Sequence, residues 1–170
     1  VYYTENVFRR DRHTGDYREI PQTGLEYIGG QAGLAESEVL SLACKSLATI
    51  GEATLDLSHM EYIEAMLAPL GDNGLRQRAL TARRAKSPHE MRMAAGEAGL
   101  GTSDAGRLAA LAGLSGPLGE AFAQARRISE GVPGTARPLD ELQALCSTVE
   151  SSGVQLRLDF SILNDVDYYN

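Results

Sequence analysis

The feature that most restricts the fold of this chain is a long alanine-rich block between two stretches with strand character. Between residues 74 and 150, short amphipathic segments such as LRQRALTARRA and LGEAFAQARRI are separated by Gly, Pro or Ser. Residues 53–57 before the block and 154–163 after it are typical of strands, and 154–163 alternates apolar and polar positions. Because the strands must share a sheet, we expect an α+β fold with a helical insertion.

The first part of the chain is typical of a β-hairpin followed by a helix. We expect strands over residues 3–8 and 17–28, joined by the charged turn RRDRHTG. Pro21 in the returning strand indicates an edge position or a bulge. Residues 35–50 then predict a helix, because apolar residues recur there at helical spacing, namely Val39, Leu42, Ala43, Leu47 and Ile50.

Two further helix starts follow from capping signals. Ser58 stands three residues before Glu61, which is the spacing of a capping box, so a helix is expected over residues 59–70. Pro138 suits the first turn of a helix over residues 139–153.

The overall composition argues against nucleic-acid binding as the main activity, although it leaves room for a local basic pocket, and against a membrane-spanning protein. The chain has 16 Lys and Arg against 23 Asp and Glu, which gives a net charge of −7. Proteins that bind nucleic acid normally have an excess of basic residues to contact the phosphates. No apolar run approaches the roughly 20 residues that cross a bilayer. Cys44 and Cys146 lie far apart in apolar helical stretches, so we expect two buried free thiols in a reducing compartment.

The hairpin carries the first candidate site. Its arginines suit the recognition of phosphate or carboxylate, because guanidinium is a planar fork; they are Arg9, Arg10, Arg12 and Arg18. Gln22 and Glu26 are four residues apart and would share a face of a regular strand. On spacing alone, an ordinary exposed hairpin with a charged tip is the simpler interpretation.

Two other places could carry function. In Asp167-Tyr168-Tyr169 the adjacent tyrosines would point to opposite faces of a strand, although half-buried structural aromatics are the simpler interpretation. His59 lies at a strand-to-helix junction and could be a ligand or a proton shuttle. No HxxxH, HExxH or Cys/His cluster is present, so no metal site is expected.

Taken together, these segments resemble the catalytic core of the histidyl-tRNA synthetase family. The hairpin VFRRDRHTGDYREIPQTGLEYIG is similar to that family's motif 2, and the closing LNDVDYYN is similar to its histidine-specific R-G-L-D-Y-Y run. AESEVLSLACKSLATIG and TLDLSH are similar to the helix and strand between them. The resemblance covers nearly the whole chain, with gaps, and implies a class II aminoacyl-tRNA synthetase-like antiparallel sheet flanked by helices, with a helical insertion.

The resemblance also implies that residues 1–170 are part of one larger core that continues beyond both ends, because the family's motifs 1 and 3 are not in this segment. Residues 1–73 would hold the motif 2 hairpin, a helix, a strand and a helix. Residues 74–150 would be the helical insertion and the following helix, and residues 151–170 the strand that leads to Asp-Tyr-Tyr.

The family has two main branches. One is the true synthetase, which activates histidine with ATP and charges tRNA. The other is the regulatory subunit of the short-form ATP phosphoribosyltransferase, which confers activity and histidine feedback on a separate catalytic subunit at the first step of histidine biosynthesis.

Several residues depart from the synthetase pattern on the side that handles ATP. Asn164 stands where synthetases carry an Arg. A neutral amide cannot balance the charge that develops on a phosphate in the transition state. Losing such electrostatic stabilisation costs ~100-fold or more in rate. Asp11 replaces the Glu of the FRxE pattern. Asp16 replaces a basic residue, and Pro21 replaces a His.

The positions that hold histidine in synthetases are better kept. The resemblance implies that Arg9 contacts a carboxylate or another anion, and that Gln22 and Glu26 bind the α-amine and orient the ring. It further implies that Tyr169 hydrogen-bonds the imidazole, with Tyr168 packed behind it.

We therefore predict a non-catalytic, cytoplasmic regulatory subunit with histidine as its effector and no cofactor. Its partners would be the catalytic subunit of the short-form ATP phosphoribosyltransferase and a second copy of itself in a dimer, with no membrane or nucleic-acid partner. A divergent histidyl-tRNA synthetase core is the alternative, and a paralogue without a ligand is the third hypothesis.

Overall fold

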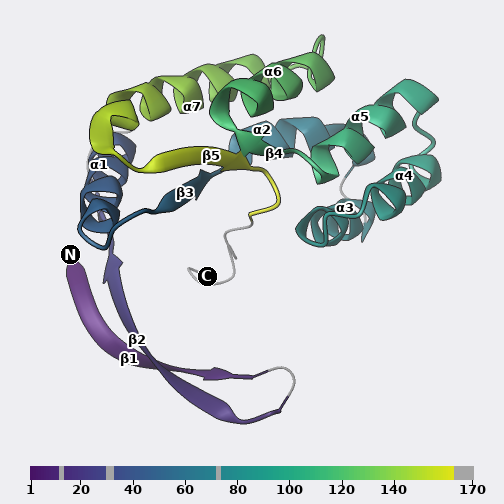
Figure 1. The fold of residues 1–170 in the computed structure, drawn as a ribbon. Coiled ribbons are helices and arrows are strands. Elements are labelled where there is room, and N and C mark those ends of the chain that lie inside the picture. The colour runs from purple at the N-terminus through teal and green to yellow at the C-terminus, as the bar shows by residue number, and fades with distance from the viewer. Residues whose placement is uncertain (12–13, 30–32, 72–73, 163–170) are drawn as a thin grey trace.

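The computed structural model describes residues 1–11, 14–29, 33–71 and 74–162, and shows a β-hairpin that projects from a body of helices and a small sheet (Figure 1). The strands are β1 (Tyr2–Arg10), β2 (Tyr17–Leu25), β3 (Thr54–Leu57), β4 (Ser115–Pro117) and β5 (Gln155–Asp159). The helices are α1 (Leu34–Ala48), α2 (Met60–Leu67), α3 (Gly74–Arg84), α4 (Pro88–Glu97), α5 (Thr102–Ala112), α6 (Leu118–Ile128) and α7 (Ala136–Val149), with short 3-10 helices at Ala68–Leu70 and Glu150–Ser152. The predicted α+β class and the helical insertion are confirmed.

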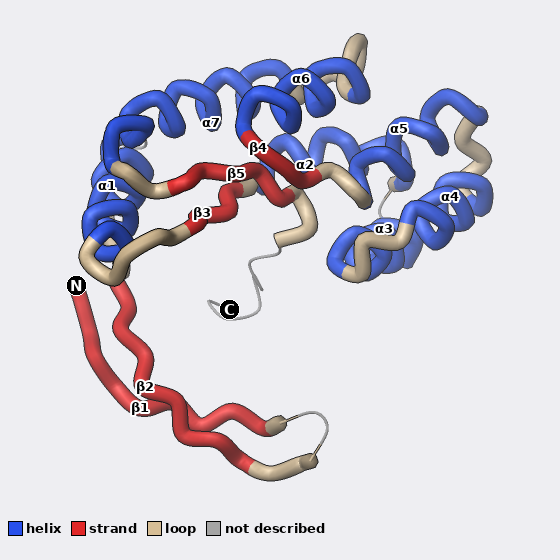
Figure 2. Tube along the Cα trace, viewed as in Figure 1, coloured by secondary structure: helices blue, strands red, loops and turns tan. Residues whose placement is uncertain are grey.

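The strands form two separate sheets (Figure 2). β1 and β2 pair antiparallel, whereas β3, β5 and β4 form a three-stranded sheet in that order. In the second sheet β3 runs parallel to β5 and β4 runs antiparallel to it, so this sheet is mixed where an antiparallel one was expected. The reason is the long insertion, because a connection of this length can bring the chain back beside β3 in the same direction.

The short strand β4 was not predicted, because Ser-Gly-Pro has the composition of a turn. Proline lacks the N–H that a central strand needs, but β4 lies at the edge of the sheet and pairs with β5 alone. The same rule fits Pro21, which lies opposite Asn6 in the two-stranded hairpin, where each strand has an open edge.

Two of the predicted helix starts are wrong. α2 begins at Met60 with His59 as its N-cap residue, and the Ser58 hydroxyl is buried with no hydrogen-bond partner among the described residues, so the capping box does not form. α7 begins at Ala136, two residues before Pro138. Proline is tolerated there because the N–H groups of the first helical turn have no partner within the helix.

The hydrophobic core joins α1 to β5 and contains none of the described hairpin residues. Its fully buried side chains include Cys44, Tyr62, Ile63, Leu67, Met91, Leu111, Leu158 and Phe160. The predicted alternation of β5 is confirmed, since Leu156, Leu158 and Phe160 are all buried. The strand then ends in a turn, which leaves Ile162 40% exposed, contrary to the predicted strand over residues 154–163.

The two cysteines are buried free thiols, as predicted. They lie in α1 and α7, which pack against each other. Within the described part of the chain, no helix combines the length and apolar character that a membrane crossing requires.

Candidate ligand-binding site

The strand register places three of the predicted site residues on one face of the hairpin. Gln22 lies opposite Glu5, and side chains that face each other in an antiparallel pair point to the same side. Arg9 is four residues from Glu5 on β1, and Glu26 is four residues from Gln22. The ladder extends to Glu26, whose backbone N–H donates to the Val1 carbonyl at 2.9 Å. Because side chains alternate along a strand, Arg9, Gln22 and Glu26 share this face.

These three side chains form a line along the hairpin. At about 3.4 Å per residue, Gln22 and Glu26 are separated by roughly 14 Å of strand, with Arg9 on the other side of Gln22. The partly buried residues Gln22, Gly24 and Glu26 alternate with exposed neighbours. The hairpin therefore presents these side chains as one partly polar wall.

Tyr3 orients Gln22 on this wall. The Gln22 side-chain amide donates to the Tyr3 hydroxyl at 3.1 Å. The Tyr3 ring lies directly over Gly24, where an added Cβ would come within 2.1 Å of the ring carbon Cζ. Only glycine permits this close approach, which is a known way of covering a glycine in a strand. Sequence reasoning missed Tyr3, although a glycine inside a predicted strand was a signal for such a contact.

The carboxylate of Asp11 lies at the tip of the hairpin and contacts other residues of the turn. Asp11 Oδ1 accepts a hydrogen bond from the Thr14 amide at 3.2 Å, and Oδ2 lies 3.3 Å from Nε of Arg18. The Asp11 backbone carbonyl accepts from the Gly15 amide at 2.9 Å. Gly15 has φ 78°, a left-handed conformation that glycine adopts at little cost. The Asp11 side chain is thus committed to closing the turn.

The remaining predicted residues, Asn164, Tyr168 and Tyr169, lie outside the described residues. The last described segment before them is the turn from Asp159 to Ile162. Arg9 is exposed and lies one residue before the end of β1.

A second cluster of charged side chains lies on the body, between the starts of α1 and α2 and the length of α7. It borders a cavity of about 550 Å³. Arg137 contacts the carboxylate of Glu61, and its Nη1 donates to Glu141 Oε1 at 2.7 Å. His59 Nε2 lies 3.6 Å from Glu141 Oε2, and His59 Nδ1 is buried without a hydrogen-bond partner in the described residues. The hydrogen bond that Arg137 donates to Glu141, together with the charges of both glutamates, raises the pKa of Arg137.

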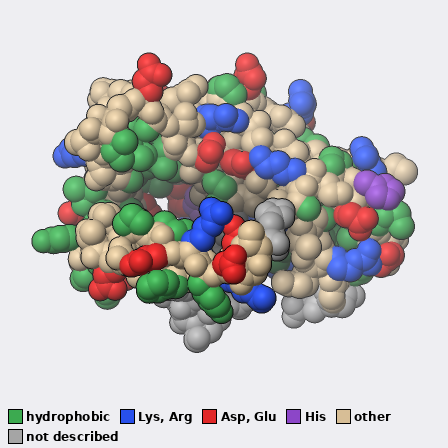
Figure 3. Space-filling model, turned by 60° about the horizontal axis from the view of Figure 1, so that its bottom comes forward, with side chains coloured by type: hydrophobic (Ala, Val, Ile, Leu, Met, Phe, Trp, Pro, Cys, Tyr) green, Lys and Arg blue, Asp and Glu red, His purple; other side chains and the backbone are tan. Residues whose placement is uncertain are grey.

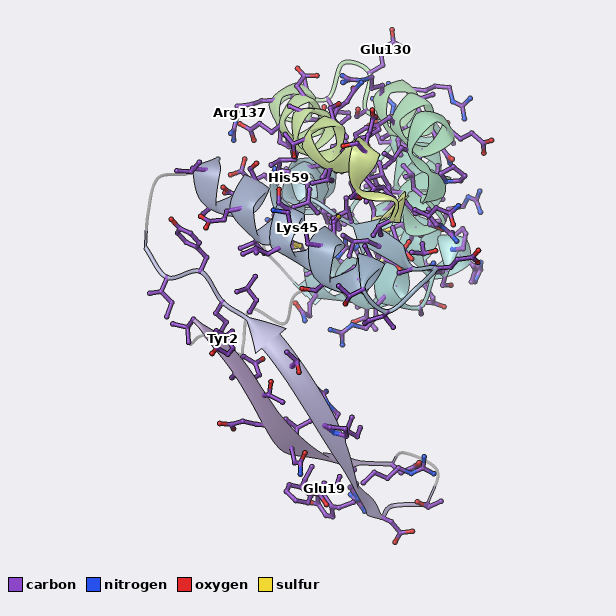
Figure 4. All side chains as sticks on the ribbon, turned by 60° about the vertical axis from the view of Figure 1, so that its left-hand side comes forward. Tyr2, Glu19, Lys45, His59, Glu130 and Arg137 are labelled. Atoms are coloured by element: carbon purple, nitrogen blue, oxygen red, sulfur yellow. The ribbon has the colours of Figure 1, made fainter. Side chains whose placement is uncertain are left out.

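Figure 4 shows His59 and Arg137 above α1 on the body, far from the hairpin that carries Tyr2 and Glu19. Both glutamates are bound to Arg137, so the cluster links α2 to α7 through ion pairs. Of this cluster the sequence singled out His59 alone, because Arg137 lies 76 residues from Glu61 and Glu141 is equally remote from His59 along the chain. Acidic and basic side chains are interspersed over the hairpin side of the molecule (Figure 3).

A motif 2-like hairpin, a small sheet and an inserted helical block together define a class II aminoacyl-tRNA synthetase-like core. The same architecture is found in a solved structure from Bacillus halodurans C, titled as an ATP phosphoribosyltransferase regulatory subunit/histidyl-tRNA synthetase. That structure matches with a TM-score of 0.73 and 26% sequence identity, and the match covers 95% of this chain and 43% of that chain. The sequence pattern of the family described as histidyl-tRNA synthetase matches residues 1–170, so this chain belongs to the histidyl-tRNA synthetase family.

Curated relatives of two kinds are similar to this chain. A histidine–tRNA ligase of Methanoregula boonei is 30% identical over 171 residues, which cover 98% of this chain and 38% of that protein. An ATP phosphoribosyltransferase regulatory subunit of Anaeromyxobacter dehalogenans is 31% identical over 165 residues, which cover 94% of this chain and 46% of that protein. The chain thus spans less than half the length of these relatives, and both branches of the family match it to a similar degree.

Proposed function

We propose that this chain is the central part of a non-catalytic regulatory subunit of an ATP phosphoribosyltransferase, and that it senses histidine for feedback in the first step of histidine biosynthesis. The intact protein would act in the cytoplasm, as a dimer in a hetero-oligomer with the catalytic transferase subunit. Histidine would act as effector to the extent that it binds one assembly state better than another.

The observation that carries this proposal is the arrangement of Asp11. Synthetases of this family have a Glu at the position of Asp11, and that longer side chain reaches the adenine edge of ATP. In this chain the carboxylate of Asp11 bonds the Thr14 amide and lies beside Arg18, inside the hairpin turn. A carboxylate held in this way is not available to bind adenine. Asn164 stands at the position of a catalytic Arg, so a charge that would stabilise the reacting phosphate of ATP is also missing.

The amino-acid side of the hairpin supports ligand binding. Arg9 offers a guanidinium that suits a carboxylate, and Glu26 offers a carboxylate that suits an ammonium group. Gln22 lies between them along the same face and is oriented by Tyr3. We propose that histidine lies at the Gln22–Glu26 end of this wall, with the hydroxyl of Tyr169 on the imidazole and Tyr168 packed behind it. Arg9 lies roughly 27 Å of strand from Glu26 and would contact a separate anion.

The alternative is a divergent histidyl-tRNA synthetase that activates histidine with ATP. The similarity to the Methanoregula boonei ligase favours it as much as the similarity to the Anaeromyxobacter regulatory subunit favours the proposal. The two functions differ in what they require of ATP, so an assay of ATP chemistry separates them.

The test uses the intact protein that contains this chain, added to a short-form catalytic subunit from the same source. ATP phosphoribosyl transfer is measured with and without histidine. We expect transfer that depends on the added protein and falls when histidine is present. No effect on the transferase, together with histidine-dependent exchange of pyrophosphate into ATP, would overturn the proposal in favour of the synthetase.

A matched pair of variants sharpens the test. Glu26→Gln should keep the activation of the transferase and weaken its inhibition by histidine. Glu19→Gln is the control, because Glu19 lies on the same strand but on the opposite face, where its carboxylate accepts from Asn6 at 2.7 Å. Equal loss of inhibition in both variants would contradict the assignment of the binding face.

A further inference from the structure

The cavity of about 550 Å³ on the body has no part in the proposed histidine site. Its lining comes from the start of α1, the start of α2 and the length of α7, whereas the predicted histidine residues that the structure describes lie on the hairpin. Figure 4 shows that the cavity residues His59 and Arg137 lie beside α1 and not on the hairpin. A cavity of this volume is large enough to hold a small organic molecule.

One part of the lining is acidic. Apart from His59, its titratable side chains are those of Arg137, Glu36, Glu61 and Glu141. Glu36 and Glu61 lie in the first turns of their helices, where the helix dipole offsets part of a negative charge. Glu141 lies in the second turn of α7, where this effect has faded. Three carboxylates and one guanidinium therefore leave an excess of negative charge at this end of the cavity.

The carboxylates of the lining have oxygens that the described residues leave without a hydrogen bond. Arg137 contacts Oε2 of Glu61 and Oε1 of Glu141, which leaves the other oxygen of each. Glu141 Oε2 lies 3.6 Å from His59 Nε2, which is longer than a hydrogen bond. Oε2 of Glu36 accepts from the amide that precedes α1 at 2.5 Å, which leaves its Oε1. The lining thus offers acceptors from three helices, and a ligand that matches them must bring N–H donors.

The other part of the lining is mostly apolar and belongs to α7. Ala144, Leu145 and Thr148 follow Glu141 along this helix and border the same cavity. The Thr148 hydroxyl already donates to the Leu145 carbonyl at 2.7 Å, so it has no donor left for a ligand. Thr148 lies seven residues from Glu141, which is about 10 Å of helix. The cavity therefore suits a ligand with a cationic head and a short apolar chain.

From this lining we propose that the cavity binds an alkylguanidinium group, the chemistry of an arginine side chain. Guanidinium carries five N–H donors in a planar fork and no acceptor, so it matches carboxylate oxygens that lack donors. It is also more weakly hydrated than ammonium, so less hydration is lost when it enters a cavity. The contacts of Arg137 with Glu61 and Glu141 show that these carboxylates accommodate a guanidinium. The alkyl chain would lie along Leu145.

The test is a titration of the intact protein with 1-butylguanidine, followed by ligand-observed nuclear magnetic resonance. The matched probe is 1-butylurea, which has a similar shape and the same alkyl chain but no charge. We expect saturable binding of the guanidine, with a dissociation constant about 10-fold or more below that of the urea, because charge-assisted hydrogen bonds are the stronger kind. Dissociation constants within about 2-fold of each other, or no saturable binding of the guanidine, would overturn the proposal.

Two variants and a control assign the binding to this cavity. Glu141→Gln and Glu36→Gln each remove a charge but keep an oxygen that can accept from the present partner, so the fold should be retained. Each should raise the dissociation constant of 1-butylguanidine by about 5-fold. Glu130→Gln should leave it unchanged, because Glu130 is exposed on the loop after α6, outside the cavity (Figure 4). Unchanged affinity in all three variants would place the guanidine elsewhere and refute the assignment.

Two further probes identify where the guanidinium comes from. Free L-arginine also carries a charged amine and carboxylate, whereas N-acetyl-L-arginine N-methylamide presents the side chain as a protein does. Tighter binding of free arginine would support a small-molecule ligand, and equal or tighter binding of the blocked form would support a side chain of another protein. Failure of both to bind would overturn the proposal. The cavity includes none of Arg9, Gln22 and Glu26, so these outcomes are independent of the proposed histidine function.

Discussion

Removing the hydroxyl of Tyr62 should change the free energy of unfolding, and the sign of this change should depend on pH. Tyr62 is fully buried; its hydroxyl donates to the Ala125 carbonyl at 3.0 Å, and its ring centre lies 4.9 Å from that of Phe160. Tyr62→Phe keeps the ring and removes only the hydroxyl. The Ala125 carbonyl is not left unpaired, because it also accepts from the Ser129 hydroxyl at 2.8 Å and the Ser129 amide at 3.1 Å. We therefore expect the free energy of unfolding at pH 7 to fall by only about 1 kcal/mol.

At alkaline pH the same variant should be the more stable protein. Burial raises the pKa of Tyr62 from 10.0 to about 12, and the hydrogen bond with Ser129 acts in the lowering direction. The unfolded chain thus loses this proton near pH 10 and the folded chain near pH 12. The contribution of Tyr62 to stability is complete below pH 10 and is lost as the pH rises through 12. Two pKa units correspond to about 2.7 kcal/mol.

Phenylalanine has no proton to lose, so the two stability curves should cross at about pH 11. At pH 12 half of the folded molecules have lost this proton, so about 2.3 kcal/mol of the contribution is lost, and the variant should be more stable by about 1.3 kcal/mol. The measurement is urea unfolding of the intact protein and of Tyr62→Phe between pH 7 and 12. All other titrating groups are common to both proteins and cancel in the difference. A difference that does not vary with pH, or a loss above about 3 kcal/mol at pH 7, would refute this reasoning.

Three further outcomes follow from the structure. Gly24→Ala should displace the Tyr3 ring and break the hydrogen bond that Gln22 donates to it. Losing this bond should weaken histidine binding by about 5-fold, or about 1 kcal/mol, and unaltered affinity in calorimetry would contradict the prediction. The thiol of Cys146 should resist a thiol reagent at pH 8 until the protein unfolds, because burial and the charge of Glu150 raise its pKa to about 11; fast labelling of the native protein would argue against this environment. Leu158→Ala, at a fully buried position of the central strand β5, should lower the free energy of unfolding by about 3 kcal/mol; a loss below about 1 kcal/mol in urea unfolding would show that the site is less tightly packed.

The sequence predicted the relations between candidate site residues on the same strand, but not their contacts with residues on other elements. Gln22 and Glu26 share a face because side chains alternate along any strand, so their spacing was enough. Tyr3 contacts Gln22 through the register between two strands, which a single strand's pattern does not contain. The charged cluster beside His59 was missed for the same reason, since Arg137 contacts Glu61, and Glu141 comes near His59, only when α2 packs beside α7.

Helix α1 shows how far periodicity reaches within one element. Its apolar spacing correctly indicated a helix, which is found at Leu34–Ala48. The most buried residues, however, are Leu40 and Cys44, whereas Leu42 on the predicted stripe is 38% exposed. A helix with apolar residues on more than one face can pack in more than one orientation, so the period does not say which face is buried.

By itself, the sequence determined the helices, the hairpin and the resemblance to the histidyl-tRNA synthetase family, because turns, periods and motifs act over a few neighbouring residues. Only the tertiary structure decided that β3 runs parallel to β5, that Ser-Gly-Pro forms an edge strand, and that Lys86 binds Asp159. Each of these is a contact between residues tens of positions apart. Such contacts depend on how the whole chain packs its core, and local patterns carry no information about which distant partner will be adjacent.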